Sequence, residues 1–289
     1  FDADTENSIE VSDIYYRFPL TDKIKGYVGA AGLDLDDIFD VTNPLLESSG
    51  TGALSRFNRR NPLVFRGTEG AGAGFNAELI EDKLTVSALY LADGEGGAAN
   101  PEDGSGLFDG SFSAGGQVVF SPIERLKLAG TYVRSFQTAE DVNLSGSTVS
   151  GFATAPFGDV DTSADQFGLG AELELGERVV VAATGGYTLA NESDGDAEAD
   201  IFTVAANVSF LDLLKEGSVL SVAGGIPPKL NSDDVAEDED TSYLIEALYK
   251  FPVNDNILVT PGAYVVLNPD HDENNDAVWV GVLRTTFKF

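Results

Sequence analysis

The stretch VWVGVLRTTFKF, residues 278–289, alternates between two kinds of side chain. Every second residue from Trp279 is aromatic, aliphatic or small, whereas the residues in between include Arg284 and Lys288. Because successive side chains of a β-strand point to opposite faces of a sheet, one face of this stretch is mostly apolar and the other is partly basic. The pattern predicts a strand whose aromatic residues lie against lipid while its basic residues face water.

The same two-residue period recurs along the whole chain. Residues 167–175, for example, carry Phe167 and Leu169 on one face and Glu172 and Glu174 on the other. About thirteen segments show the pattern, and most are about 9–14 residues long, which suits the ~9–11 residues of a strand that crosses a bilayer better than the ~5–6 of most soluble strands. The segments are 9–18, 23–32, 70–80, 83–92, 111–121, 124–136, 163–175, 177–190, 199–210, 217–226, 241–251, 256–267 and 276–289.

The connections between these segments alternate between short and long. A transmembrane barrel with tight turns on its periplasmic rim and longer loops on its outer rim has this pattern, and a soluble β-sandwich has no physical reason for it. The sequence therefore predicts an all-β, transmembrane, antiparallel up-and-down β-barrel. The long connections are 33–69, 93–110, 137–162, 191–198, 227–240 and 268–275.

Composition excludes several other classes of protein. The 289 residues include 48 Asp and Glu against 17 Lys and Arg, for a net charge of −31. Nucleic acid is not expected as a partner, because phosphate binding needs a basic surface. The absence of cysteine excludes disulfides and thiolate metal sites.

Strand parity predicts that part of the barrel precedes residue 1. The segment 9–18 runs into a short turn and the last segment ends on the same rim, so about thirteen strands would leave an odd count. Bacterial single-chain barrels have an even count, because an open edge in lipid leaves backbone groups unpaired. We expect at least one further strand before Phe1; the alternative is a strand overlooked within 33–69.

Several stretches resemble the S-layer-homology porins of cyanobacteria, which are related to carbohydrate-selective porins. The resemblance covers nearly the whole chain, and the SRFNRRNP and RTTFKF motifs are its most specific parts. The stretches are DDIFD (36–40), NPLLESSGTGALSRFNRRNPLVF (43–65), GLFDGSFSA (106–114), SPIERLKLAGTYV (121–133) and DNILVTPGAYVVLNPDHDENNDAVWVGVLRTTFKF (255–289).

This resemblance implies a cyanobacterial outer-membrane protein with a 16-stranded barrel that assembles as a homotrimer. It also implies a periplasmic peptidoglycan-binding domain, which is absent from residues 1–289, and three strands before residue 9. Residues 1–289 are then the C-terminal part of one porin barrel domain. The implied partners are outer-membrane lipid, two further copies of the chain, peptidoglycan and the permeating solutes.

Alternation assigns a mixed set of charged and polar side chains to the lumen. Such residues can form a transverse field that orients a permeating solute, or they can simply wet a water-filled interior. The predicted pore-lining residues are Asp13, Arg17, Lys25, Gln117, Arg125, Lys127, Glu172, Glu174, Glu246, Lys250, Arg284 and Lys288.

The connection 33–69 is far longer than a rim loop needs. We expect it to fold into the barrel and narrow the pore, with its arginines opposite carboxylates. The alternative is a surface lobe or a latch between subunits. The predicted constriction residues are Asp34, Asp36, Asp37, Arg56, Arg59 and Arg60, with Asp40 close by in sequence.

No catalytic constellation is recognisable. The chain has one histidine, His271, in an acidic loop, and we interpret it as a solvated loop residue. The acidic stretches 194–200, 233–240 and 270–276 could hold Ca²⁺, but solvated loops that enrich cations at the pore mouth are the better interpretation. The glycine-rich stretches 70–74 and 94–97 lack the Lys-Ser/Thr of a phosphate-binding loop.

These observations favour a passive diffusion porin for inorganic ions and small hydrophilic solutes, without enzymatic activity, cofactor or bound metal. The alternatives are a sugar-selective channel, a non-conducting barrel that ties the outer membrane to the cell wall, and a soluble acidic all-β surface protein.

Overall fold

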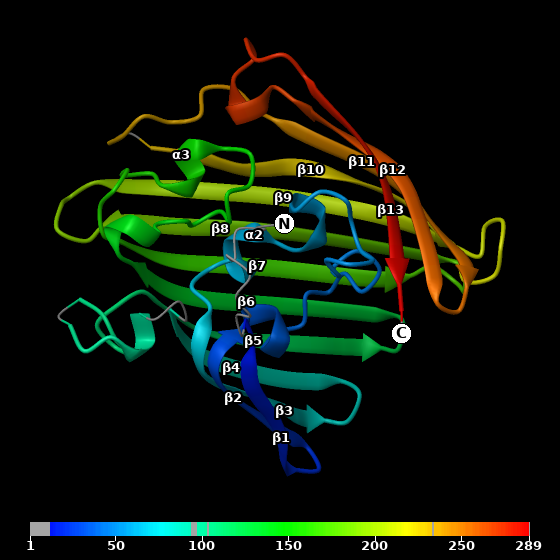
Figure 1. Cartoon of the computed structure of the whole chain (residues 1–289), viewed down its shortest axis with the longest axis horizontal. Coiled ribbons are helices and arrows are strands. Elements are labelled where there is room, and N and C mark those ends of the chain that lie inside the picture. Colours follow the sequence, from blue (N-terminus) through cyan, green and yellow to red (C-terminus); the bar gives the residue numbers. More distant parts are fainter. Residues whose placement is uncertain (1–11, 94–96, 103, 233, 289) are drawn as a thin grey trace, which may run out of the picture.

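In the computed structural model, thirteen antiparallel strands form one sheet in strict sequence order (Figure 1). The structure describes residues 12–93, 97–102, 104–232 and 234–288. The predicted all-β, up-and-down topology is confirmed. The strands are β1 (Ile14–Thr21), β2 (Ile24–Leu33), β3 (Gly70–Ile80), β4 (Leu84–Asp93), β5 (Phe112–Ile123), β6 (Leu126–Gln137), β7 (Thr162–Glu174), β8 (Val179–Glu192), β9 (Glu198–Leu211), β10 (Val219–Asn231), β11 (Tyr243–Asn254), β12 (Ile257–Leu267) and β13 (Val278–Phe287).

Twelve of the predicted segments match a strand closely, and the first requires a correction. Strand β1 begins at Ile14 rather than at residue 9, and residues 9–11 lie outside the described part of the chain. The final strand ends at Phe287, and Phe289 lies outside the described residues. The count of sixteen strands for the whole protein stays a prediction.

The two faces of the sheet differ as the alternation predicts. Leu169, Trp279 and Leu283 are 72%, 76% and 73% exposed on the convex face, whereas Gln117 and Glu246 are buried on the concave face. The convex face is therefore rich in large apolar side chains that no described residue covers. Such a face matches the apolar outer band of a membrane barrel.

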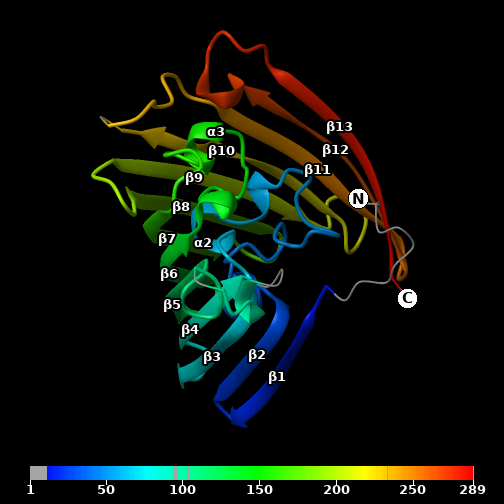
Figure 2. The ribbon, with the colours of Figure 1, turned by 60° about the vertical axis from the view of Figure 1, so that its left-hand side comes forward.

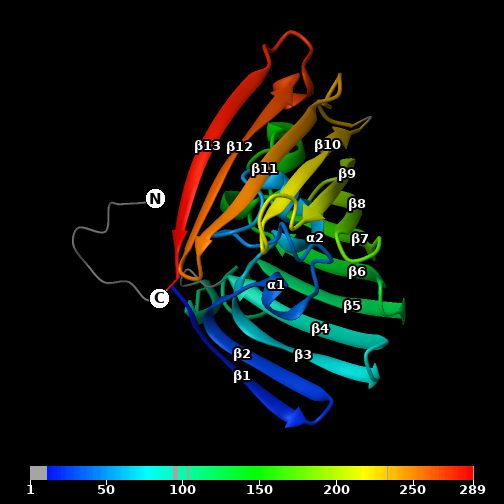
Figure 3. The ribbon, with the colours of Figure 1, turned by 90° about the vertical axis from the view of Figure 1, so that its right-hand side faces the viewer.

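The sheet curves around residues 34–69, and β1 and β13 form its two edges (Figures 2 and 3). No pairing joins these two strands within the described ranges. Short turns join strands on one rim, and the long connections on the other rim carry the small helices η2 (Gly97–Ala99), η3 (Ala139–Asp141), α3 (Gly151–Thr154) and η4 (Pro269–His271).

Residues 34–69, hereafter the inserted loop, fold against the concave face of the sheet (Figure 3). The loop contains α1 (Leu35–Ile38), η1 (Phe57–Arg59) and α2 (Pro62–Phe65). Its apolar residues, including Ile38, Val64 and Phe65, pack against Leu89 and Val133 of the wall. The alternative of a surface lobe does not describe this arrangement. The described residues contain no helix long and apolar enough to cross a membrane.

Candidate functional site

The inserted loop is fixed to the wall by a buried carboxylate. Glu246 of β11 is 1% exposed, and it accepts hydrogen bonds from the backbone N–H groups of Leu54 and Ser55, from Ser55 Oγ and from Asn58 Nδ2. A buried carboxylate is costly unless it is hydrogen-bonded, and these four donors satisfy both of its oxygens. Glu246 is therefore an anchor of the loop rather than a free pore-lining charge.

Two more predicted lumen residues fasten the other end of the loop. Gln117 accepts a hydrogen bond from Asp40 N at 2.7 Å and donates one to Asp40 O at 2.9 Å. Lys127 lies between the carboxylates of Asp40, at 2.9 Å, and Glu172, at 4.0 Å. The inward position of these side chains follows from strand alternation, but their partners come from a segment that alternation does not describe.

Cations of β11 and β13 bind carbonyl oxygens of the loop. Arg284 donates to the carbonyl groups of Ser49, Gly52 and Ala53, and Lys250 donates to that of Leu45. Carbonyl groups of the loop that form no hydrogen bond within a helix or strand thereby accept hydrogen bonds from charged donors. The loop is held from β5 and β6 on one side to β11 and β13 on the other, so it spans the interior of the sheet.

The other predicted lumen residues lie toward the rims. Arg17 and Lys25 share the concave face with Tyr27, according to their strand pairing, but their side chains are exposed. Arg125 lies in the turn between β5 and β6 rather than in the wall. Asp13 precedes β1, Glu174 ends β7 and Lys288 follows β13, all of them exposed.

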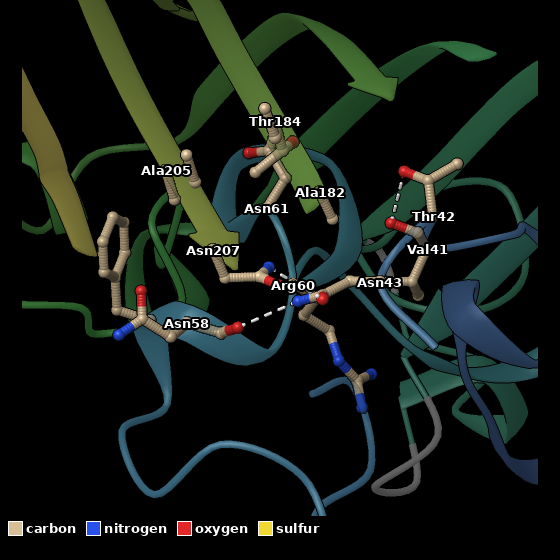
Figure 4. A pocket seen from close by; sticks show the side chains of 13 residues that line it. Val41, Thr42, Asn43, Asn58, Arg60, Asn61, Ala182, Thr184, Ala205 and Asn207 are labelled. Carbon is tan, nitrogen blue, oxygen red and sulfur yellow. Dashed lines mark hydrogen bonds between the residues drawn. The ribbon is translucent and has the colours of Figure 1, made fainter. Parts of the chain in front are cut away.

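Asparagines hold the middle of the loop tightly against β8 and β9 (Figure 4). Asn61 Nδ2 donates to Gly185 O at 2.9 Å, and Asn207 Nδ2 donates to Asn43 Oδ1 at 3.0 Å. The remaining space between loop and wall has a volume of about 20 Å³, which is room for about one water molecule. This side of the loop is too narrow for a solute, and the sequence reading did not single out its asparagines.

A much larger cavity, of about 550 Å³, lies on another side of the loop. Three of the predicted constriction residues, Arg56, Arg59 and Arg60, line it together with Arg66, which was not among the predicted residues. Of the predicted constriction carboxylates, only Asp34 lines it. The other acidic residues of its lining are Glu69, Asp93 and Asp141.

Asp36 and Asp37 have structural partners instead. Asp36 forms an ion pair with Arg60. Asp37 accepts hydrogen bonds from Asp34 N at 3.0 Å and from Tyr15 Oη at 3.2 Å. Glu69 and Asp141 thus line the cavity with the arginines, whereas Asp36 and Asp37 do not, and the pore constriction stays a prediction. Glu69 could have been noticed as the last acidic residue before β3.

Burial and crowding shift the protonation of the charged groups in this cavity. Burial, followed by the repulsion of Arg56 and Arg60, lowers the pKa of Arg66 to about 9. Burial, followed by the repulsion of Glu69, raises the pKa of Asp34 to about 7. The same causes, burial first and then Asp36, raise the pKa of Glu69. The surroundings of Arg66, Asp34 and Glu69 thus favour the neutral form of each side chain.

His271 is not the solvated loop residue that the sequence suggested. It is 1% exposed, its Nδ1 accepts a hydrogen bond from Ser242 N at 2.8 Å, and its Nε2 lies 2.9 Å from Pro228 O. The Nδ1 atom therefore carries no proton, and Nε2–H donates to the carbonyl group. This neutral imidazole joins the β12–β13 connection to the β10–β11 connection, a contact between loops that no local pattern indicates.

The acidic connections use several carboxylates as internal partners. Asp238 accepts from Ser150 Oγ at 2.9 Å and from Leu230 N at 2.7 Å, which ties the β10–β11 and β6–β7 connections together. No group of three or more metal-type ligands occurs in the described residues. Of the glycine-rich stretches, Gly70–Gly74 lies within β3, and residues 94–96 lie outside the described part.

The chain belongs to the carbohydrate-selective porins, because residues 1–289 match the family described as "Carbohydrate-selective porin, OprB family". It is 33% identical over 311 residues to the uncharacterized protein sll0772 of Synechocystis sp., covering 100% of this chain and 56% of that protein. The uncharacterized protein alr4550 of Nostoc sp. is 31% identical over 305 residues, covering 98% and 51%. The chain thus spans about half the length of the curated relatives it matches.

Solved outer-membrane proteins share the fold. The loop L8 deletion mutant of Vibrio cholerae OmpT has a TM-score of 0.67 at 10% identity, covering 98% of this chain and 82% of that chain. A trimer form of OmpT has a TM-score of 0.56 at 12% identity, covering 92% and 75%. Pseudomonas putida OprB has a TM-score of 0.55 at 11% identity, covering 96% and 73%. The predicted porin-type barrel fold and porin family are confirmed; a link to S-layer-homology domains stays a prediction.

Replacing Glu246 with alanine should release the inserted loop. Four donors would lose their acceptor, and hydrogen bonds to a charged group contribute about 1.5–3 kcal/mol each. We expect tryptic cleavage after Arg59 and Arg60, both half-buried in the native loop, to become at least about tenfold faster. Glu174→Ala, at an exposed strand end, is the matched control. Equal cleavage rates in Glu246→Ala and the native protein would show that Glu246 does not anchor the loop.

The contact of His271 should weaken in acid. Burial lowers the pKa of His271 below its ordinary 6.5, against the attraction of Asp238 and Asp270 and together with the repulsion of Lys229. The opened loops therefore bind more protons than the closed ones, so the stabilisation is complete above pH 6.5 and is lost as the pH falls through the lowered pKa. Hydrogen exchange at Ser242 N–H, corrected for intrinsic rates, should accelerate in this range. A His271→Gln variant with the same pH profile would contradict this role.

Proposed function

We propose that the chain forms most of the wall of a water-filled, passive diffusion channel in the outer membrane. The inserted loop narrows the passage, and the cavity beside it, about 550 Å³ in volume, is part of the route. The observation that carries this proposal is the pairing of an apolar outer face with a concave face that holds a charged, solvent-accessible cavity. A structural barrel that only anchors the membrane does not need such a cavity.

Inorganic ions and small hydrophilic solutes are the proposed cargo. The charges around the cavity create a field across the passage, which acts on solutes as they cross. Sugars are a second candidate, because the name of the family specifies carbohydrate selectivity. Phe65 is the one aromatic residue among the described residues that line the cavity, so the lining offers charges rather than a stacking surface.

The assembly of the whole protein is proposed by analogy. OmpT of Vibrio cholerae has a trimer form, and we propose a homotrimer surrounded by outer-membrane lipid for this protein as well. The cyanobacterial relatives support an origin in the outer membrane of a cyanobacterium. Additional strands that close the sheet between β1 and β13, and a peptidoglycan-binding domain, complete the proposed protein.

Replacing Arg59 with alanine should shift ion selectivity toward cations. The substitution removes a positive charge from the cavity lining, and the pore field acts directly on permeating ions. Reversal potentials of the intact protein under a KCl gradient measure this shift, with Arg60→Ala as a second variant whose ion pair with Asp36 is also lost. The control is Arg178→Ala in the exposed β7–β8 turn. Unchanged reversal potential and conductance in both loop variants would place the ion path elsewhere.

A further inference from the structure

Several charged side chains that line the large cavity have no ion-pair partner among the described residues. Of its four arginines, only Arg60 forms an ion pair with a described residue, Asp36. The side chains of Arg56 and Glu69 form no hydrogen bond or ion pair with any described residue. Within the described part of the chain, the cavity therefore holds both a cation and an anion whose side chains have no hydrogen-bond or ion-pair partner.

The unpaired groups are nevertheless close enough to influence one another. The positive charges of Arg56, Arg60 and Arg66 each lower the pKa of Glu69, although burial raises it overall. No nitrogen of these arginines lies within 4.0 Å of a Glu69 oxygen, which is the limit for an ion pair. Opposite charges that attract each other are therefore held more than 4.0 Å apart.

The arginines and the carboxylates of the proposed site come from different stretches of the chain, with Glu69 at the very end of the inserted loop. The arginines lie on the inserted loop between residues 56 and 66. Glu69 directly precedes β3, and Asp141 lies in η3. Ser111 Oγ at 3.0 Å and Thr138 Oγ1 at 2.9 Å donate to one oxygen, Oδ2, of Asp141, so this carboxylate is oriented by the rim while its other oxygen remains available.

The arginine wall is also held in place. Arg66 Nη2 donates to Arg56 O at 2.9 Å, and its aliphatic stem packs on Gly146 of the β6–β7 connection, where φ is +61°. Any side chain at Gly146 would collide with Arg66. The Nε atom of Arg66 is buried without a hydrogen-bond partner among the described residues.

We propose that this cavity is a binding station for small zwitterions, of which free α-amino acids are the natural class. Arg56 and Arg66 would hold the carboxylate, and Glu69 and Asp141 the ammonium group. An uncharged solute leaves both walls without a partner, and a simple anion satisfies only the arginines. A cavity of about 550 Å³ also lies within the ~300–1,000 Å³ of small-molecule sites.

The proposal rests on the proposed channel function, and solute uptake tests the two separately. The intact protein in liposomes is offered three probes at equal low concentration: glycine, its uncharged isomer glycolamide, and the anion glycolate. We expect glycine to enter at least about threefold faster than glycolamide, because only glycine can bridge the opposite charges. The isomers have the same composition, so pore width affects both similarly.

Single substitutions on either wall should remove this preference. Arg66→Gln and Glu69→Gln are each expected to slow the entry of glycine to the rate of glycolamide. The entry rate of glycolamide should stay unchanged, and this unchanged rate shows that the variant is folded and its channel open. Arg56→Gln replaces Arg66→Gln should the latter fail to fold. The matched controls are Arg178→Gln and Glu177→Gln, in the exposed β7–β8 turn, which should retain the preference.

Three results would overturn the proposal or its basis. Equal entry of glycine and glycolamide into liposomes with the native protein would refute the zwitterion site and leave the channel intact. Glycolate could instead enter fastest, at a rate that Arg66→Gln lowers and Glu69→Gln does not change. That result would identify an anion site. Failure of all three probes to enter would refute the channel function itself.

Discussion

The alternation of side chains along each strand is the constraint on which the rest of the structure depends. A strand that crosses a bilayer must satisfy its backbone hydrogen bonds within the sheet, so only the side chains distinguish lipid from water. In β7, Phe167, Leu169 and Leu173 share one face, and in β13 Trp279, Leu283 and Phe287 do the same. The opposite face is thereby free to carry polar groups, and the inserted loop depends on those groups for its position.

The polar face of the wall serves first as an attachment surface. Glu246, Gln117, Lys250 and Arg284 all bind backbone groups of the inserted loop, which has little secondary structure to satisfy them. Backbone groups in a buried loop require such partners. The charges that remain available to a solute are then those of the loop and the rim, chiefly Arg56, Arg66 and Glu69, rather than those of the strands.

The strands were predictable from sequence because their signal is local. The predicted segment 70–80 coincides with β3, and most other boundaries lie within about three residues, because each apolar–polar alternation is complete within one strand. The placement of the loop required contacts at a distance: Glu246 is 191 residues from Ser55. The length of the loop suggested insertion, but only the tertiary contacts show which of its carboxylates meet arginines.

The prediction that His271 is solvated was wrong for the same physical reason. A polar side chain in an acidic loop is normally solvated, and His271 is buried because Ser242 and Pro228, from two other segments, supply its partners. Likewise, Arg66 and Glu69 line a cavity to which the β6–β7 connection contributes Asp141 and Asn143. Sequence periodicity carries no information on how one rim loop folds over another.

The central claim is that odd and even positions of a strand meet different solvents, and spin-label accessibility along β13 tests it most directly. The chain has no cysteine, so single cysteines introduced at residues 279–286 can be labelled without background in the intact protein reconstituted in lipid. Oxygen, which partitions into hydrocarbon, should collide most with labels at 279, 281, 283 and 285 and least with those at 280, 282, 284 and 286. An accessibility profile without this two-residue period, or with the opposite phase, would contradict the account.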